Sequence, residues 1–177
     1  KKITQVVKER TGEIMFGLNM VVHKGKTIFV GDTSVHEYPS SEQLSEIAIS
    51  SARVVRLFGF DPKVAFVSHS TFGQPLTSRT KHIKDAVEIL KKKNVNFEFD
   101  GDMQPDVALD EEYKSLYPFS KIVGSANILI MPGQHSAAIS YKMMKTLGDT
   151  KVIGPLLIGL GLPIEIAPLR SSTSEII

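Results

Sequence analysis

Short, uniformly apolar runs alternate in this chain with longer amphipathic segments, and this alternation limits the fold classes that the chain can adopt. The runs at residues 64–67 and 127–131 are the clearest, because a strand buried on both faces of a parallel sheet is apolar throughout. Residues 79–93, between them, place apolar side chains at the spacing of a helix. The pattern predicts the α/β class, as a three-layer αβα sandwich with a mostly parallel sheet.

The N-terminal part predicts an antiparallel hairpin followed by a helix. Residues 15–22 and 27–30 are strand-like and flank a turn in which Gly25 can adopt a positive φ. Ser40 and Gln43 have the spacing of a capping box, and Gly59 supplies a C-terminal stop. We therefore expect the helix to lie between Ser40 and Gly59.

The remaining elements follow by the same reasoning. Strands are predicted at residues 96–99, 152–153 and 164–166, a short helix at 110–116 and a longer one at 136–147. The longer helix is expected to turn four apolar side chains toward the core: Ile139, Met143, Met144 and Leu147.

Composition excludes several classes of protein. Of the 177 residues, 42% are hydrophobic and 23% charged, and the net charge of +2 provides no broad basic surface for nucleic acid. No apolar run reaches the roughly 18 residues of a membrane span, and no signal peptide is visible. The absence of cysteine excludes disulfides, thiolate metal sites and a cysteine nucleophile. We expect a cytoplasmic protein.

The length suits one domain with a sizeable core, which we place at residues 1–177. The chain begins at Lys1 without a methionine and ends at Ile177 on a run typical of the start of a helix. We therefore expect it to be a fragment of a longer polypeptide.

The loop after residues 64–67 is the first candidate ligand site. It reads Ser68-His69-Ser70-Thr71-Phe72-Gly73-Gln74-Pro75, and hydroxyl and free backbone N–H groups between a strand and a helix can surround an anion. It is neither a Walker loop nor a dinucleotide fingerprint. A polar loop that caps its own helix is the alternative, and the residues alone favour it. Nearby, Arg79 is placed to face a phosphate, whereas Lys81 is expected to be a solvated surface residue.

The loop after residues 96–99 carries four aspartates: Asp100, Asp102, Asp106 and Asp110. The glycine placement and terminal glutamate of an EF-hand are missing, which excludes that calcium site. Two interpretations remain, a loop that caps its own helix and a cleft lined by Asp102 and Gln104. The histidines have no metal-ligand spacing, and His69 and His135 are expected at the surface.

Residues 154–161 form a glycine-rich segment that begins with Gly154-Pro155. Because the segment follows an apolar run, it is expected to face a ligand, where small residues let a pantetheine arm or another subunit approach closely. A tight connection between strands, pinned by glycine, explains the composition equally well.

Five segments, in this order, resemble the phosphate acetyl/butyryltransferase family over residues 31–177. They are Gly31–Val35, Ser41–Ala48, Ser68–Gly73, Asp100–Asp106 and Gly154–Gly159. The third, SHSTFG, and the fourth, DGDMQPD, are more similar to the version fused to the C-terminus of bacterial NADP-dependent malic enzymes than to the free-standing enzyme.

The resemblance implies a cleft between two α/β lobes in which coenzyme A and an acyl phosphate meet, with this chain covering mainly the second lobe. It also implies a homodimer or higher homo-oligomer. In the fused malic enzymes the domain is thought to bind acetyl-CoA as an effector, while upstream domains with NADP and a divalent metal decarboxylate malate. The positions expected near the ligand here, none of them catalytic, are Ser68, Thr71, Gly73, Asn127, Pro132, Gly154 and Arg170.

Two segments depart from the free-standing family. That family uses an S-R-G segment and a nearby acid for phosphate binding and thiol deprotonation. The corresponding positions, aligned from Pro163, are Pro168, Leu169 and Glu175. A one-residue shift places Arg170 at the arginine position, but the serine is missing in either register, and a leucine cannot replace a bidentate guanidinium. The family's PDLNTGN turn appears at residues 132–138 without its aspartate and asparagines.

These departures favour a regulatory domain of a malic enzyme that dimerises and senses an acyl-CoA without converting it. The first alternative is a working phosphate acetyltransferase or butyryltransferase that uses Ser70, Thr71 and Arg170. The second is a purely structural oligomerisation domain.

Overall fold

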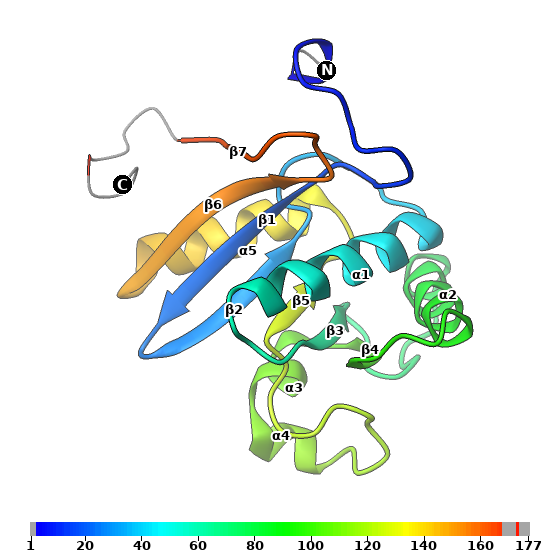
Figure 1. Cartoon of the computed structure of the whole chain (residues 1–177). Coiled ribbons are helices and arrows are strands. Elements are labelled where there is room, and N and C mark those ends of the chain that lie inside the picture. The colour runs from blue at the N-terminus through cyan, green and yellow to red at the C-terminus, as the bar shows by residue number, and fades with distance from the viewer. Residues whose placement is uncertain (1–2, 168–172, 174–177) are drawn as a thin grey trace.

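A seven-stranded sheet forms the centre of the computed structural model, which describes residues 3–167 and 173 (Figure 1). The strands are β1 (Phe16–His23), β2 (Lys26–Gly31), β3 (Lys63–Val67), β4 (Glu98–Met103), β5 (Ile128–Ile130), β6 (Thr150–Ile158) and β7 (Ile164–Glu165). The helices are α1 (Ser41–Leu57), α2 (Ser78–Lys92), α3 (Pro105–Leu109), α4 (Glu111–Ser115) and α5 (Gln134–Leu147), preceded by a 3-10 turn at Ile3–Gln5.

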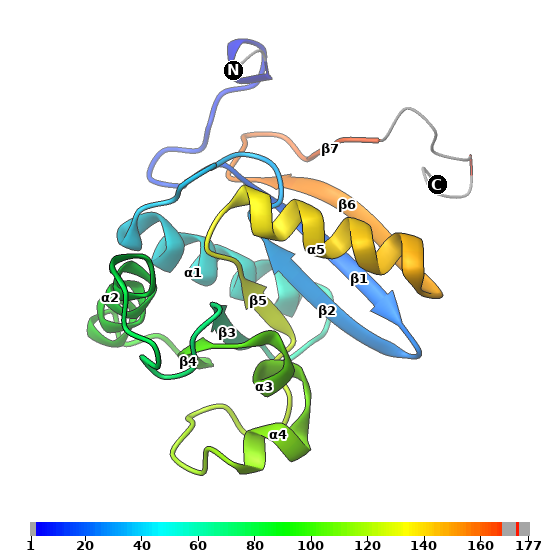
Figure 2. The ribbon, with the colours of Figure 1, turned by 180° about the vertical axis from the view of Figure 1, so that it is seen from behind.

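The sheet has the order β4-β3-β5-β2-β1-β6-β7. Its first four strands are parallel, whereas β1, β6 and β7 pair in antiparallel fashion. Helices α1 and α2 cover one face, and α5 and α3 lie on the other (Figures 1 and 2). The predicted αβα sandwich, with its parallel core and its hairpin of β1 and β2, is therefore confirmed.

Two apolar clusters hold the three layers together, and β3 shows how they are separated. Val64 and Phe66 pack with the side chains of α1 and α2, whereas Ala65 and Val67 pack with those of α3 and α5. Because neighbouring side chains of a strand point to opposite faces, a fully apolar run buries both faces at once. This is the physical basis of the prediction made from residues 64–67.

Helix α1 begins where the capping box predicts. The Ser40 hydroxyl accepts a hydrogen bond from Gln43 N at 3.2 Å, and Ser40 N donates to the Gln43 side chain at 2.8 Å. Gly59, with φ of 84°, follows the C-terminal end. Helix α2 also has a capping box, between Thr77 and Thr80. No helix among the described residues is long and apolar enough to cross a bilayer.

The orientation predicted for α5 is wrong for three of its four side chains. Ile139, Met143 and Leu147 are 56%, 54% and 80% exposed, and only Met144 packs on the core. The buried face instead carries Ala137. The helix has apolar residues on two sides, and its small residue lies against the sheet, where a helix can approach closely.

Two segments predicted as loops are strands in part. Residues 150–158 form the continuous strand β6, so Gly154 lies within the sheet and the expectation of a loop there is wrong. Two residues of β6, Gly154 and Pro155, stand opposite Asn19 of β1, as the register shift there requires. Such a bulge tolerates glycine and a proline that has no N–H to donate. Similarly, β4 extends to Met103, and Pro105 then begins α3.

Candidate functional site

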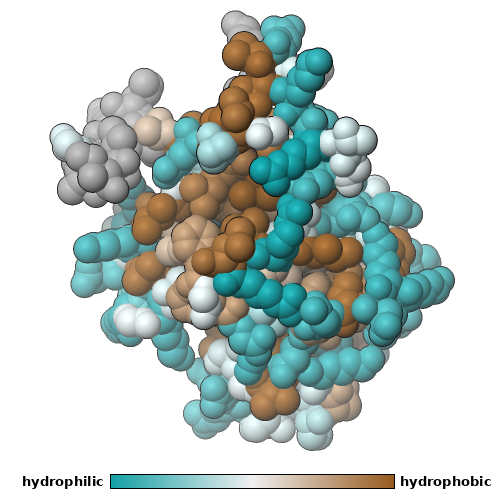
Figure 3. Space-filling model, viewed as in Figure 1, coloured by the Kyte–Doolittle hydropathy of each residue, from teal (hydrophilic) through white to brown (hydrophobic). Residues whose placement is uncertain are grey.

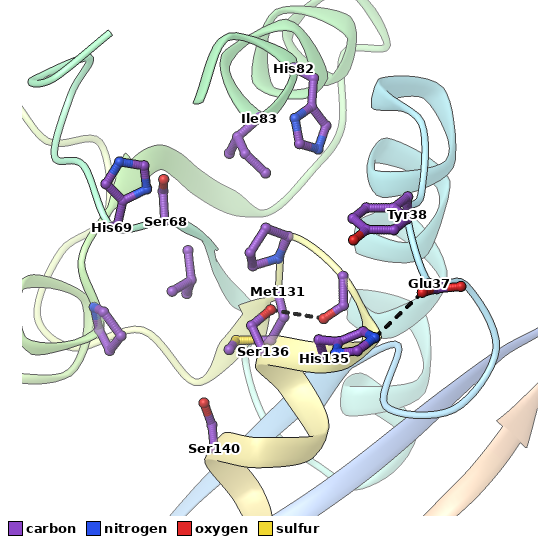
Figure 4. Close-up of a pocket in the computed structure, with 14 residues that line it drawn as sticks. Glu37, Tyr38, Ser68, His69, His82, Ile83, Met131, His135, Ser136 and Ser140 are labelled. Carbon is purple, nitrogen blue, oxygen red and sulfur yellow. Dashed lines mark hydrogen bonds and ion pairs between the residues drawn. The ribbon is translucent and has the colours of Figure 1, made fainter. Parts of the chain in front are cut away.

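A cavity of about 610 Å³ opens at the carboxyl ends of β3 and β5 (Figure 4). Ser68 follows β3, Pro132 follows β5, and His135 projects from the first turn of α5. The helix α2 and the loop before α1 complete the lining with His82 and Tyr38. In open α/β sheets, ligands bind outside the carboxyl ends of the strands, which makes this cavity the candidate site.

The N-terminus of α5 gives the cavity a positive electrostatic end. The first turn contains no acidic residue, and the N–H groups that begin a helix have no partners within it. One of them, Gln134 N, donates to His36 O at 3.2 Å. Ser136 does not cap the helix, because its hydroxyl donates to Gly133 O at 2.8 Å. This end of the cavity therefore suits an anionic group of a ligand.

Three histidines surround the cavity. Figure 4 shows His82 projecting from α2, His69 beside Ser68, and His135 next to Glu37; the last pair is 3.4 Å apart. Among the residues whose side chains the structure describes, which do not include Arg79, no lysine or arginine lines the cavity. The nitrogen-bearing side chains of the described lining are therefore imidazoles. The expectation that His69 and His135 are exposed is confirmed.

The loop at residues 68–74 directs its donors inward. Ser70 N donates to Ser68 Oγ at 3.3 Å, Phe72 N to Asp102 O at 2.6 Å, and Gly73 N to Asp102 Oδ1 at 3.0 Å. Thr71 N donates to Gln74 O at 3.1 Å. The N–H groups that the anion hypothesis requires are thus engaged within the protein, and the self-bonded polar loop is the structure observed.

The aspartates of the β4–α4 region hold the backbone. Asp102 is almost fully buried and accepts from the Ser70 hydroxyl as well as from Gly73. Asp110 accepts from Glu112 N at 2.8 Å and caps α4, as the capping interpretation expects. Neither Asp102 nor Gln104 is among the described residues that line this cavity, so the cleft interpretation stays a prediction. No cluster in the described part of the chain could hold a metal ion.

Of the positions expected near a ligand, Ser68 and Pro132 line the cavity. Thr71 and Gly73 belong to the adjoining loop, where the Thr71 hydroxyl accepts from Gln104 N at 3.3 Å. Arg170 lies outside the described residues, as do the other positions compared with the S-R-G segment.

Asn127 lies at the opposite end of the strands. Its Oδ1 accepts from Lys63 N at 2.8 Å, and its Nδ2 donates to Asp61 O at 2.7 Å. These bonds join the amino ends of β3 and β5. Gly154, in the bulge of β6, is also absent from the described lining of this cavity. The structure therefore does not bring these two residues together with Ser68 and Pro132.

Sequence reasoning did not find Tyr38, His82 or Ser140, which also line the cavity. His82 immediately precedes Ile83, which belongs to the apolar face of α2, so its position beside that face was the available signal. Tyr38 and Ser140 reach the cavity only through the tertiary packing of α1 and α5.

Two lysines outside the cavity have partners within the protein. Lys81 Nζ contacts Asp85 Oδ2 at 2.8 Å along the exposed side of α2, which confirms its expected surface role. Lys114 is buried and donates to Gly124 O at 2.6 Å. Desolvation by this burial lowers the pKa of Lys114 below its ordinary value.

Known proteins match this chain throughout its length. The family model for phosphate acetyl/butaryl transferase matches residues 1–177. The NADP-dependent malic enzyme of Rhizobium meliloti (strain 1021) is 39% identical over 175 residues, which are 99% of this chain and 23% of that protein. The phosphate acetyltransferase of Bacillus subtilis (strain 168) is 33% identical over 163 residues, 91% of this chain and 50% of that protein.

Solved structures share the fold. The EutD phosphotransacetylase from Staphylococcus aureus has a TM-score of 0.90 and 27% identity, with 99% of this chain and 55% of that one covered. The chain thus spans about half of these transferases and about a quarter of the malic enzyme. The match along all residues is sufficient to assign the family: this chain belongs to the phosphate acetyl/butaryl transferases.

Proposed function

We propose that the cavity at the carboxyl ends of β3 and β5 binds coenzyme A or an acyl-CoA, and that the domain senses this ligand without converting it. The observation that carries the proposal is the N-terminus of α5, whose first turn has no acidic residue and opens into that cavity, and where Glu37 is paired with His135. It suits the phosphate groups of the ligand. The volume of about 610 Å³ is within the range of about 300–1,000 Å³ that is usual for small-molecule sites.

The lack of conversion rests on the chemistry of the described lining. Transfer of an acyl group between phosphate and a thiol needs fixed positive charge for the developing anion and a base for the thiol. The described lining, which does not include the side chains of Arg79 and Arg170, offers histidines, serines and a tyrosine, but no lysine or arginine. Ser136 and Ser68 are both engaged in hydrogen bonds within the protein.

A working phosphate acetyl- or butyryltransferase is the second candidate. The similarity to the Bacillus subtilis phosphate acetyltransferase favours it. In that case Arg170 would act as the phosphate clamp together with Ser70 and Thr71. The Ser70 hydroxyl already donates to Asp102, which makes it a poor donor for a phosphate.

The parent protein in this proposal is an NADP-dependent malic enzyme in the cytoplasm, and acetyl-CoA is its effector. Malate would be oxidised and decarboxylated by upstream domains, which would hold NADP and the divalent metal. The similarity to malic enzymes over nearly all of this chain supports the assignment. An effector acts only if it binds one arrangement of the assembly better than another.

Two exposed apolar surfaces support the proposal that the domain contacts other proteins or domains. The exposed stripe of Ile139, Met143 and Leu147 on α5 suits a second copy of this chain, because a two-fold axis can place one such stripe against the other. The second surface lies between α1 and β6, where Figure 3 shows a brown area. Arg10 of the N-terminal segment and Ile164 of β7 line this groove, so it suits the remaining domains of the parent chain.

The test combines calorimetry with an activity assay. Acetyl-CoA and coenzyme A are titrated into the protein, and thioester formation from acetyl phosphate and coenzyme A is followed separately. We expect binding without turnover. Replacing Ser140 by Phe fills the cavity and should abolish binding, whereas the matched change Thr146→Phe, on the exposed part of α5, should not. Turnover at an enzymatic rate would establish the transferase instead.

A further inference from the structure

A buried chain of hydrogen bonds links the cavity to a carboxylate beneath it. Ser68 lines the cavity (Figure 4) although only 7% of its surface is exposed. Its Oγ lies 3.1 Å from the Oγ of Ser70, which is fully buried. The Ser70 hydroxyl in turn contacts Oδ2 of Asp102, which is 1% exposed. The order is therefore Asp102, Ser70, Ser68 and then the cavity.

The carboxylate fixes the direction of every bond in this chain. An ionised Asp102 can only accept, and a serine has a single proton to give. The Ser70 hydroxyl donates its one hydrogen bond to Asp102. In the contact with Ser68, the Ser70 Oγ must therefore be the acceptor and the Ser68 hydroxyl the donor. Ser68 also accepts from Ser70 N at 3.3 Å. The Ser68 Oγ therefore has one lone pair left to accept a hydrogen bond from a ligand, and no hydrogen left to donate.

We propose that Asp102 and Ser70 position Ser68 as an obligate hydrogen-bond acceptor, so that the cavity selects ligands that bring an N–H or S–H donor to Ser68. Amides and thiols are the chemical groups concerned, and their identification with the pantetheine part of coenzyme A rests on the proposed function. An anionic group is repelled at Ser68, since two acceptors would face each other there. It is accommodated at the α5 end of the same cavity instead.

Replacing Asp102 by Asn reverses the direction of these hydrogen bonds. Asp102 Oδ1 accepts from Gly73 N at 3.0 Å, so the amide oxygen of an asparagine must occupy that place. The NH₂ group then faces Ser70 and donates to its Oγ. Ser70 is left to donate to Ser68, and the Ser68 proton is released toward the cavity. D102N thus changes Ser68 from an acceptor into a donor.

The experiment uses two probes, pantetheine, which offers amide and thiol donors without phosphate, and sulfate, which offers acceptors only. In D102N we expect the affinity for pantetheine to fall about tenfold and that for sulfate to rise, in keeping with one hydrogen bond lost or gained. D106N is the matched control, because Asp106 is exposed and, among the described residues, its carboxylate accepts a bond only from the adjacent Val107 N, at 2.9 Å. It removes the same charge and should change neither affinity.

Opposite shifts for the two probes support the inference, and equal or parallel shifts overturn it. Ser70→Ala is a second variant that breaks the chain without adding a donor, and it should shift both affinities in the same directions as D102N by less. This covers the case in which D102N does not fold, as judged by circular dichroism. If coenzyme A fails to bind the wild type, the proposed function fails, whereas the sulfate comparison still decides the role of Asp102.

Discussion

Gly154 occupies a backbone position that a larger residue cannot take. Its φ is 109°, a region in which L-residues are strained. A Cβ at this position would lie 2.8 Å from Leu18 O and 2.9 Å from Leu156 N. Both are backbone atoms of paired strands, so neither can move without disturbing the sheet. The residue therefore serves the bulge of β6 and the pairing with β1.

We expect Gly154→Ala to lower the free energy of unfolding by at least about 3 kcal/mol, because strain adds to a backbone clash. Gly25→Ala is the control: it shares a positive φ, of 77°, but a Cβ there would meet nothing within 4 Å, so about 1–2 kcal/mol is expected. Urea unfolding of both variants measures the difference. Equal losses would contradict the clash.

The segment before β1 is held to the body of the domain by an ion pair and a backbone bond. The two terminal guanidinium nitrogens of Arg53, on α1, donate to the Glu13 carboxylate at 2.7 and 2.8 Å. Arg10 N donates to Gly159 O at 2.9 Å. The hydrogen bonds from Arg53 lower the pKa of Glu13 below its ordinary value. The segment therefore depends on Glu13 being ionised.

This dependence predicts a pH effect of known sign. Because the pKa of Glu13 is lower in the folded state, its contribution is complete above the unfolded-state pKa and is lost as pH falls through the folded-state pKa. E13Q should cost less than about 1 kcal/mol at neutral pH, as for other partly exposed pairs, and nothing in strong acid. Glu9→Gln, on the same segment, is the control. A cost of E13Q that does not change between pH 7 and pH 3 would contradict the pairing.

The start of α1 could be predicted from the sequence, but the orientation of α5 could not. The start of α1 follows from Ser40 and Gln43 because a capping box is a local interaction over three residues. The buried face of α5 follows from the shape of the sheet, which selects Ala137 over larger apolar residues. Local patterning contains no information on that choice.

The same distinction applies to the candidate site. The place of Ser68 at a strand end could be predicted, since it follows a run of four apolar residues. The direction of its hydrogen bonds depends on Asp102, 34 positions later on a neighbouring strand. Likewise, His82 and Tyr38 reach the cavity from elements whose packing the sequence alone does not specify.

At the scale of the whole molecule, apolar surface remains after the core is complete. The core fills both faces of the parallel strands, yet α5 exposes Ile139, Met143 and Leu147, and the groove beside α1 exposes Leu57 and Leu162. Contiguous exposed apolar surface of this kind is typical of contacts with other proteins.

Self-association should depend on the α5 stripe. We expect the double variant I139E/M143E to shift the protein toward monomer in sedimentation equilibrium, because two buried carboxylates would face each other across a two-fold axis. Leu76→Glu alters a similarly exposed apolar residue in the loop before α2 and should leave the association unchanged. Loss of association in L76E, or its retention in I139E/M143E, would contradict the assignment.

Asp102 lies on β4, the strand at the edge of the sheet, whereas the cavity is built from the strands and helices further in. An edge strand is bonded to a neighbouring strand on one side only. Aspartate and asparagine codons differ by one base. In the proposed arrangement, a single point mutation is therefore enough to exchange a preference for amides and thiols for one for oxyanions, without any change in the residues that line the cavity.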